Sequence, residues 1–288
     1  MRQEISVLVS AGILLLGGLC TSMAVTISGS DLLGPAIEEA LGAELSSSGT
    51  DGGFEFDGSL LGVKSLEDGD SVAAILALSD DTEKPGGLTL LPIGYQVAAF
   101  AVHAENPVSE LTYSQLSAIY ADSGPINSWG DISDDAAWKE RGMTIWAARS
   151  SKTMSLELFN AVVIDGSLLK QSVRYSTETG SDLLNLVRED SAGIVLVPQI
   201  EAIPSVRFLA IKADESGQAY TPSADNIFFG DYPLRLPFYL AVSESSAKAE
   251  IASILRGIFS AKVTEAMEAA GFVPLPVSER RSILSQFE

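Results

Sequence analysis

Short apolar runs alternate with helical patterns from residue 25 onwards, and this alternation limits the possible folds more than any other feature. Residues 25–27 and 54–56 have strand character, and each is followed by a Gly/Ser turn and apolar residues at helical spacing. Residues 72–78 are apolar throughout, which is typical of a strand buried on both faces. The alternation predicts α/β architecture, with parallel sheets covered by helices.

The same rhythm continues to the end of the chain. Further strands are expected over residues 143–147, 193–197, 207–211 and 238–242. Helices are expected over residues 112–120, 153–163, 181–187, 247–260 and 263–270. The long apolar stretch 88–102 can run from one domain into another, and a chain of 288 residues is long enough for about two domains.

The first 24 residues are typical of a targeting segment. Residues 5–19 are apolar, and Ser22-Met23-Ala24 places small residues around a cleavage position. We therefore expect a signal peptide over residues 1–24 and an exported, periplasmic or envelope-associated protein. A retained membrane anchor and a lipoprotein attached through Cys20 are the alternatives; the apolar run is short for a spanning helix, which needs about 20 residues.

Composition argues for binding rather than catalysis. The net charge of −20 disfavours nucleic acid and anionic lipid as partners. One Cys and one His leave little support for zinc sites, disulfides or imidazole catalysis, and His103 is expected to pack at the end of a strand. No nucleophile-elbow or P-loop pattern is complete. We expect no enzyme activity, metal or cofactor.

Small hydroxyl residues and glycines stand where predicted strands give way to predicted helices. The three segments are Ser28-Gly29-Ser30, Gly58-Ser59 and Arg149-Ser150-Ser151-Lys152-Thr153. A helix start exposes unpaired N–H groups and favours negative charge, hydroxyls add donors, and an arginine adds a planar fork suited to an oxyanion. Simple helix capping is the alternative for each segment. Three such segments at the carboxyl ends of strands favour an anion site, because ligands of α/β proteins bind there.

Eight segments in order resemble the periplasmic phosphate-binding proteins of ABC transporters, and the match extends from Val25 almost to the C-terminal end. The segments are VTISGS (25–30), GSLLGVKSLEDG (58–69), PIGY (92–95), NPV (106–108), INSWGD (126–131), AGIV (192–195), YPLRLP (232–237) and GFVPL (271–275).

The resemblance implies a class II periplasmic-binding fold with two α/β lobes, each a mostly parallel sheet flanked by helices. Residues 25–96 and 238–288 would form the first lobe and residues 97–237 the second, with crossovers near residues 97 and 237. The lobes would close by hinge motion on inorganic phosphate or a related tetrahedral oxyanion. The protein would act as a monomer that delivers this anion to the membrane subunits of an ABC transporter.

The resemblance also assigns the hydroxyl-rich segments to the ligand site. The residues expected to bind the anion are Ser28, Gly29, Ser30, Asp57, Gly58, Ser59, Arg149, Ser150, Ser151, Lys152 and Thr153. Asp57 is included because HPO₄²⁻ keeps a proton that a carboxylate can accept, whereas sulfate has none to donate. Asp31 is a second candidate for this acceptor.

The site departs from the family pattern in three places. The loop at Arg149 reads as a shortened form of R-x-x-x-S-G-T, with Lys152 where the family has a glycine. Ala74 stands where the family has an acidic residue, and Ser79-Asp80 replaces its S-R. These departures support an alternative: a diverged paralogue that binds no phosphate and serves as an interaction or sensory module of the cell envelope.

Overall fold

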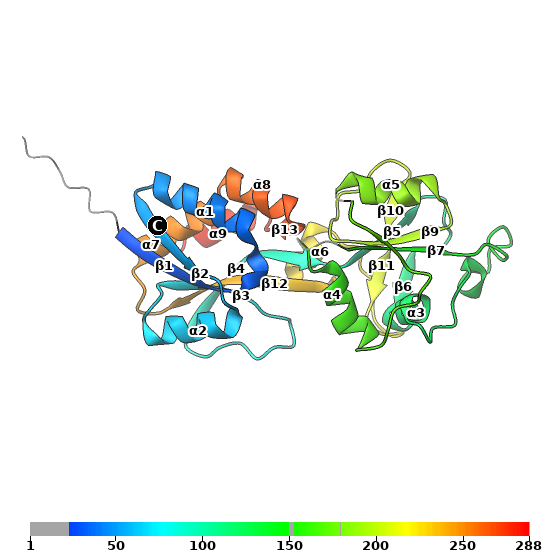
Figure 1. The fold of residues 1–288 in the computed structure, drawn as a ribbon, viewed down its shortest axis with the longest axis horizontal. Coiled ribbons are helices and arrows are strands. Elements are labelled where there is room, and N and C mark those ends of the chain that lie inside the picture. Colours follow the sequence, from blue (N-terminus) through cyan, green and yellow to red (C-terminus); the bar gives the residue numbers. More distant parts are fainter. Residues whose placement is uncertain (1–22, 150–152, 179, 288) are drawn as a thin grey trace, which may run out of the picture.

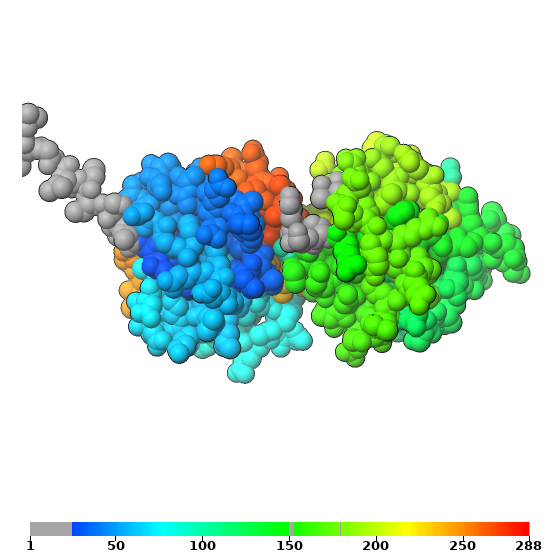
Figure 2. Space-filling view, in the orientation of Figure 1, coloured from blue at the N-terminus to red at the C-terminus, as the bar shows by residue number. Residues whose placement is uncertain are grey.

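The computed structural model describes residues 23–149, 153–178 and 180–287 of the chain. Two lobes lie side by side, joined by extended strands that run from one to the other (Figure 1). Two rounded bodies meet at a narrow waist in the space-filling view (Figure 2). The predicted α/β fold class is confirmed. The predicted leader lies outside the described residues, apart from Met23 and Ala24, which begin the first strand.

The first lobe is built on a six-stranded sheet in the order β13-β4-β12-β3-β1-β2. Its strands are β1 (Met23–Gly29), β2 (Thr50–Glu55), β3 (Ala73–Ala77), β4 (Leu88–Val97), β12 (Arg235–Ser243) and β13 (Phe272–Pro274). Its helices are η1 (Asp31–Leu33), α1 (Pro35–Ser47), α2 (Ser59–Asp68), α7 (Lys248–Ile258), α8 (Ala261–Ala269) and α9 (Val277–Leu284). Helix α2 covers one face of the sheet, and the other helices gather on the opposite face (Figure 1).

The second lobe contains a five-stranded sheet in the order β10-β5-β9-β7-β8 and a small sheet of β11 and β6. The strands are β5 (Ala99–His103), β6 (Glu110–Thr112), β7 (Thr144–Ala148), β8 (Arg174–Ser176), β9 (Gly193–Val197), β10 (Val206–Phe208) and β11 (Ala210–Lys212). The helices are α3 (Tyr113–Tyr120), η2 (Trp129–Asp131), α4 (Ser155–Phe159), η3 (Asn160–Ile164), α5 (Ser181–Glu189) and α6 (Ala224–Phe229).

The crossover strands give each sheet a mixed character, which corrects the expectation of mostly parallel sheets. Strands β2, β1 and β3 pair in parallel, as do β8, β7 and β9. Strand β12 runs antiparallel to both β3 and β4, and β5 runs antiparallel to β9 and β10. The reversal arises because the chain crosses between the lobes along β4 and returns along β12. The predicted boundaries at residues 97 and 237 remain a prediction.

Local chemistry explains most element limits. Thr112 begins α3 with a complete capping box, in which its hydroxyl accepts from Gln115 N–H and the Gln115 side chain accepts from Thr112 N–H. Gly69 ends α2 in the left-handed conformation. The strand expected over residues 207–211 is wrong as one element, because Leu209 separates β10 from β11, which belong to different sheets. The helix expected over residues 153–163 continues from α4 into the π-helical turn η3.

Large apolar side chains fill the space between sheet and helices in both lobes. Ile27, Leu41 and Leu45 are fully buried in the first lobe. The rings of Phe100, Tyr120 and Phe159 pack edge-to-face in the second, with centroids 5.1–5.6 Å apart. These cores hold the strand ends in place, so the loops that face the other lobe start from fixed points.

Candidate functional site

Two loops of the first lobe meet directly where β1 and β2 end. Gly29 lies so close to β3 that a Cβ on it would stand 2.0 Å from the Ile75 carbonyl oxygen, and its φ of +135° is open only to glycine. The Gly58 N–H donates to the Gly29 carbonyl over 2.8 Å. The two predicted lobe-1 segments are therefore adjacent, as the sequence analysis expected.

The three predicted hydroxyls of the first lobe already make hydrogen bonds within that lobe. Ser28 Oγ donates to the Gly62 carbonyl and lies 2.9 Å from Ser71 Oγ. Ser59 Oγ accepts from the Ala77 N–H over 3.0 Å. Ser30 Oγ accepts from the Leu32 N–H and caps η1, so capping explains this serine. Ser28 and Ser59 thus use their O–H groups within the lobe, whereas Ser30 Oγ only accepts there and its O–H group stays free to donate to an anion.

The first turn of α1 supplies unused donors at the same edge. Its N-cap is Gly34, which has no side chain to cap the helix, and Pro35 follows at the first helical position. Glu38 N–H reaches the Gly34 carbonyl at 3.3 Å, whereas the N–H groups of Ala36 and Ile37 have no acceptor among the described residues. A helix of 13 residues therefore presents an uncapped, partially positive N-terminus.

This helix start forms one wall of a cavity between the lobes. The cavity has a volume of about 340 Å³. Its lining comes from η1 and the start of α1, from the end of α8, and from Thr153 and Met154 at the edge of the second lobe. Thr153 is only 9 % exposed. A largely buried threonine that lines the same cavity as an uncapped helix start places a hydroxyl donor and free N–H groups around one space, which is suited to a bound anion.

Thr153 is held in position from two sides. The neighbouring Met154 N–H donates to Gln96 Oε1 over 3.1 Å, and this bond holds the loop against the end of strand β4. On the other side, Gly271 packs against Thr153, since a Cβ on Gly271 would lie 2.8 Å from Thr153 Cγ2. The hydroxyl is therefore fixed relative to both lobes.

Arg149 is the predicted charged donor, and an aromatic ring orients it. Its backbone N–H donates to the carbonyl of Ser176, the last residue of the edge strand β8, over 2.8 Å. Its guanidinium carbon lies 5.1 Å from the ring centroid of Tyr175, a cation–π distance. No carboxylate in the described part of the chain forms an ion pair with Arg149. Its side chain is exposed and lines neither the cavity at Thr153 nor the other cavity between the lobes.

The candidate proton acceptors differ in position. Asp57 is exposed and does not line the cavity, whereas Asp31 is exposed and lines it. Asp31 is thus the better-placed carboxylate of the two. Asp80, in the Ser79-Asp80 segment that stands where the family has S-R, forms a two-point ion pair with Arg235, with both N···O distances at 2.8 Å. The predicted residues Ser150, Ser151 and Lys152 lie outside the described residues.

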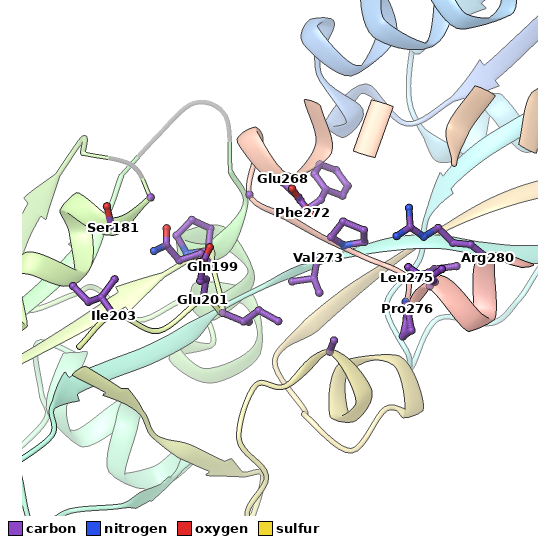
Figure 3. A pocket seen from close by; sticks show the side chains of 17 residues that line it. Ser181, Gln199, Glu201, Ile203, Glu268, Phe272, Val273, Leu275, Pro276 and Arg280 are labelled. Atoms are coloured by element: carbon purple, nitrogen blue, oxygen red, sulfur yellow. The ribbon is translucent and has the colours of Figure 1, made fainter. Parts of the chain in front are cut away.

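A second, larger cavity of about 640 Å³ also lies between the lobes. Ser181, Gln199 and Glu201 of the second lobe face the segment 271–277 across it (Figure 3). The charged residues in its lining are two carboxylates, Glu201 and Glu268, and one cation, Arg280. The charged residues of this lining sum to −1, as do those of the cavity at Thr153, where Asp31 is the one charged residue, so charge does not distinguish the two cavities.

Sequence reasoning missed several groups around Thr153. Ser155 is 1 % exposed, Gln96 is 2 % exposed, and each has a buried polar atom without a partner among the described residues. The family pattern R-x-x-x-S-G-T identifies Ser155, because its threonine lies six residues after the arginine and Ser155 lies six after Arg149.

The fold and the interlobe cavity define a two-lobed α/β binding protein. The model of the PBP superfamily domain matches residues 18–254, and the chain belongs to this family. Among solved structures, a possible phosphate binding protein from Planctomyces limnophilus superposes with a TM-score of 0.69 at 15 % identity, covering 92 % of this chain and 98 % of that one. An ABC-type phosphate transport receptor from Vibrio cholerae gives 0.58 at 20 % identity, covering 88 % and 100 %.

The curated relatives are matched over a smaller share of their own length than these two structures are. Protein SphX of Synechococcus elongatus is 22 % identical over 203 residues, which are 68 % of this chain and 59 % of SphX. The phosphate-binding protein PstS of Pseudomonas aeruginosa is 22 % identical over 197 residues, covering 65 % and 60 %. The chain spans about three-fifths of the length of these relatives. Within residues 23–149, 153–178 and 180–287, no helix has the length and apolar content needed to cross a bilayer.

Proposed function

We propose that this protein is an exported solute-binding protein that holds phosphate, or a similar tetrahedral oxyanion, between its lobes for delivery to the membrane subunits of an ABC transporter. The observation that carries the proposal is the cavity between α1 and Thr153, which is lined by an uncapped helix start of one lobe and by a largely buried threonine of the other. The names of the relatives and of the similar structures support phosphate as the ligand.

Each group has a distinct part in binding. The N–H groups of Ala36 and Ile37 and the Thr153 hydroxyl donate to anion oxygens. Arg149, steadied by Tyr175, supplies the positive charge and reaches the anion as the lobes close. The Asp31 carboxylate accepts a hydrogen bond from the proton that HPO₄²⁻ retains. The net charge of −20 does not prevent capture, because charges beyond a Debye length of about 8 Å are screened.

The test is titration of the full chain, stripped of bound ligand, with phosphate. Arg149→Ala should weaken binding at least tenfold, about 1.4 kcal/mol, because a charge-assisted donor is lost. Arg188→Ala, an exposed arginine on α5 whose closest carboxylate contact is 3.9 Å, is the matched control and should change nothing. Equal affinity of the Arg149→Ala and Arg188→Ala variants for phosphate would show that Arg149 does not bind the anion.

The second candidate is the diverged paralogue that acts as an envelope interaction module. The observation in its favour is that Ser28 and Ser59 donate their O–H groups to carbonyls within the first lobe. Melting curves separate the two functions. Phosphate at about a hundred times its dissociation constant adds about 2.7 kcal/mol of stability if it binds the folded protein. Superimposable curves with and without phosphate would favour the interaction module.

A further inference from the structure

Gln96 is a polar side chain buried where the two lobes join. It is the last residue but one of strand β4 and is only 2 % exposed. In the sheet it lies between Leu236 of β12 and Phe272 of β13, which are both uncharged and apolar. A buried amide costs free energy unless hydrogen bonds satisfy it, so packing alone does not account for a glutamine at this position.

The Gln96 side chain is satisfied at one end. Its Oε1 accepts from the Met154 backbone N–H over 3.1 Å, although the two residues are 58 positions apart in the chain. Its Nε2 is buried and has no hydrogen-bond partner among the described residues. The Met154 N–H is a donor, so the amide must present its oxygen to it, and the NH₂ group is left over. The acceptor is therefore the part of this side chain that the structure uses.

The peptide that Gln96 holds belongs to the wall of the cavity at Thr153. Thr153 and Met154 are the residues that the second lobe contributes to the lining. On the other side of the same loop, Gly271 packs so closely that a Cβ on it would lie 2.8 Å from Thr153 Cγ2. Gly271 directly precedes Phe272, the register partner of Gln96. The ends of β4 and β13 therefore meet the loop at one place, and the Gln96 oxygen fixes the loop there.

We propose that Gln96 is a positioning residue of the anion site: its side-chain oxygen fixes the Met154 N–H, and with it the Thr153 hydroxyl, relative to strand β4. The inference rests on the proposed function, because phosphate is the ligand whose affinity depends on this contact. A glutamate could offer the same acceptor at the same chain length. Its carboxylate would add a negative charge behind the cavity wall, whereas the amide accepts without charge.

The test measures the phosphate affinity of the full chain between pH 5 and pH 8. Each variant is compared with the wild type at the same pH, which cancels the titration of phosphate itself. Gln96→Met keeps the length of the side chain and removes the acceptor, so it should weaken binding about tenfold at every pH. Gln96→Glu keeps an acceptor, and burial favours the neutral form of its carboxyl at low pH. Its affinity should approach that of the wild type at pH 5 and fall at least tenfold below it at pH 8.

Two controls separate positioning from a loss of structure. Gln115→Glu introduces the same change at a residue that caps α3 and lines neither interlobe cavity, and it should match the wild type at every pH. The melting temperature of Gln96→Met without ligand should stay close to that of the wild type. The reason is that one unpaired group, Gln96 Nε2, is exchanged for another, the Met154 N–H.

The outcomes also separate this inference from the proposed function. Weak binding by Gln96→Met together with recovery of Gln96→Glu at pH 5 would support the inference. Wild-type affinity of Gln96→Met, or an equal loss in both variants at every pH, would overturn it. If the wild type binds no phosphate, the proposed function fails, and amide exchange of the free proteins decides on Gln96. The Met154 N–H should then exchange faster in Gln96→Met than in the wild type, and equal rates would overturn the positioning role.

Discussion

Thr153 is 9 % exposed and lines the same cavity as the start of α1. Gly271 makes this position possible, because its φ of +77° and the missing side chain let the C-terminal segment pass against Thr153 Cγ2. The hydroxyl is thus held ready for an acceptor.

Replacing Thr153 by Val removes the hydroxyl and keeps the shape. We expect phosphate to bind about tenfold more weakly, because a hydrogen bond to a charged group is lost, while the melting temperature without ligand stays the same. Thr153→Ser, which keeps the hydroxyl, is the matched control and should retain most of the affinity. Calorimetric titration and thermal melting of the three proteins give both readouts. Wild-type affinity in the Val variant would show that this hydroxyl does not touch the anion.

At the scale of elements, Arg235 connects the start of β12 to both lobes. Its guanidinium donates to both carboxylate oxygens of Asp80, in the loop after β3. It also donates to the carbonyls of Ile227 and Phe228 near the end of α6. It lies 5.2 Å from the ring centroid of Tyr95, whose pKa is raised to about 12 by burial, so the ring stays neutral at physiological pH. One side chain thus fastens α6 of the second lobe to a loop of the first.

Asp80→Asn should lower the free energy of unfolding by about 1 kcal/mol, because the Arg235 side chain is only 11 % exposed while Asp80 is 51 % exposed and partly screened. For a chain of this size, the melting temperature should fall by about 2–4 °C. Glu189→Gln, which breaks an exposed 3.9 Å pair with Arg188, should have no measurable effect. Denaturant unfolding measures both. Equal stabilities of the two variants would mean that Asp80–Arg235 is an ordinary surface pair.

The sequence was a good guide to elements whose signals are local. Strand β9 over residues 193–197 and helix α3 within residues 112–120 were both predicted, because each depends on neighbouring residues. Strands β6, β8 and β13, of three residues each, were not, since only pairing with distant partners stabilises them. Asp80–Arg235 was missed for the same reason: its partners are 155 residues apart.

The candidate site could be predicted only in part. Sequence reasoning placed Gly29, Gly58, Arg149 and Thr153 at strand ends, and the structure has them there. It could not show that Ser28 and Ser59 bond within their own lobe, because Ser71 and Ala77 come close to them only after the sheet forms. The free N–H groups at the start of α1 could not be predicted either, because they are backbone groups that no sequence motif marks.

At the scale of the whole molecule, the proposed function depends on both lobes contributing to one cavity. The first lobe gives the start of α1, and the second gives Thr153 and Met154. Strands β4 and β12 connect the lobes, and rotation about them can bring the two sets of groups together (Figure 1). An anion held this way is contacted from both lobes at once, which links binding to closure.

Amide hydrogen exchange of the full chain, with and without saturating phosphate, tests this central claim most directly. The N–H groups of Ala36 and Ile37 have no acceptor among the described residues, so they should exchange rapidly in the free protein. Phosphate should slow exchange in peptides covering residues 31–37 and, at the same concentration, in peptides covering residues 153–158. Protection confined to residues 198–203 and 271–277, beside the larger cavity, or no protection at all, would contradict the account.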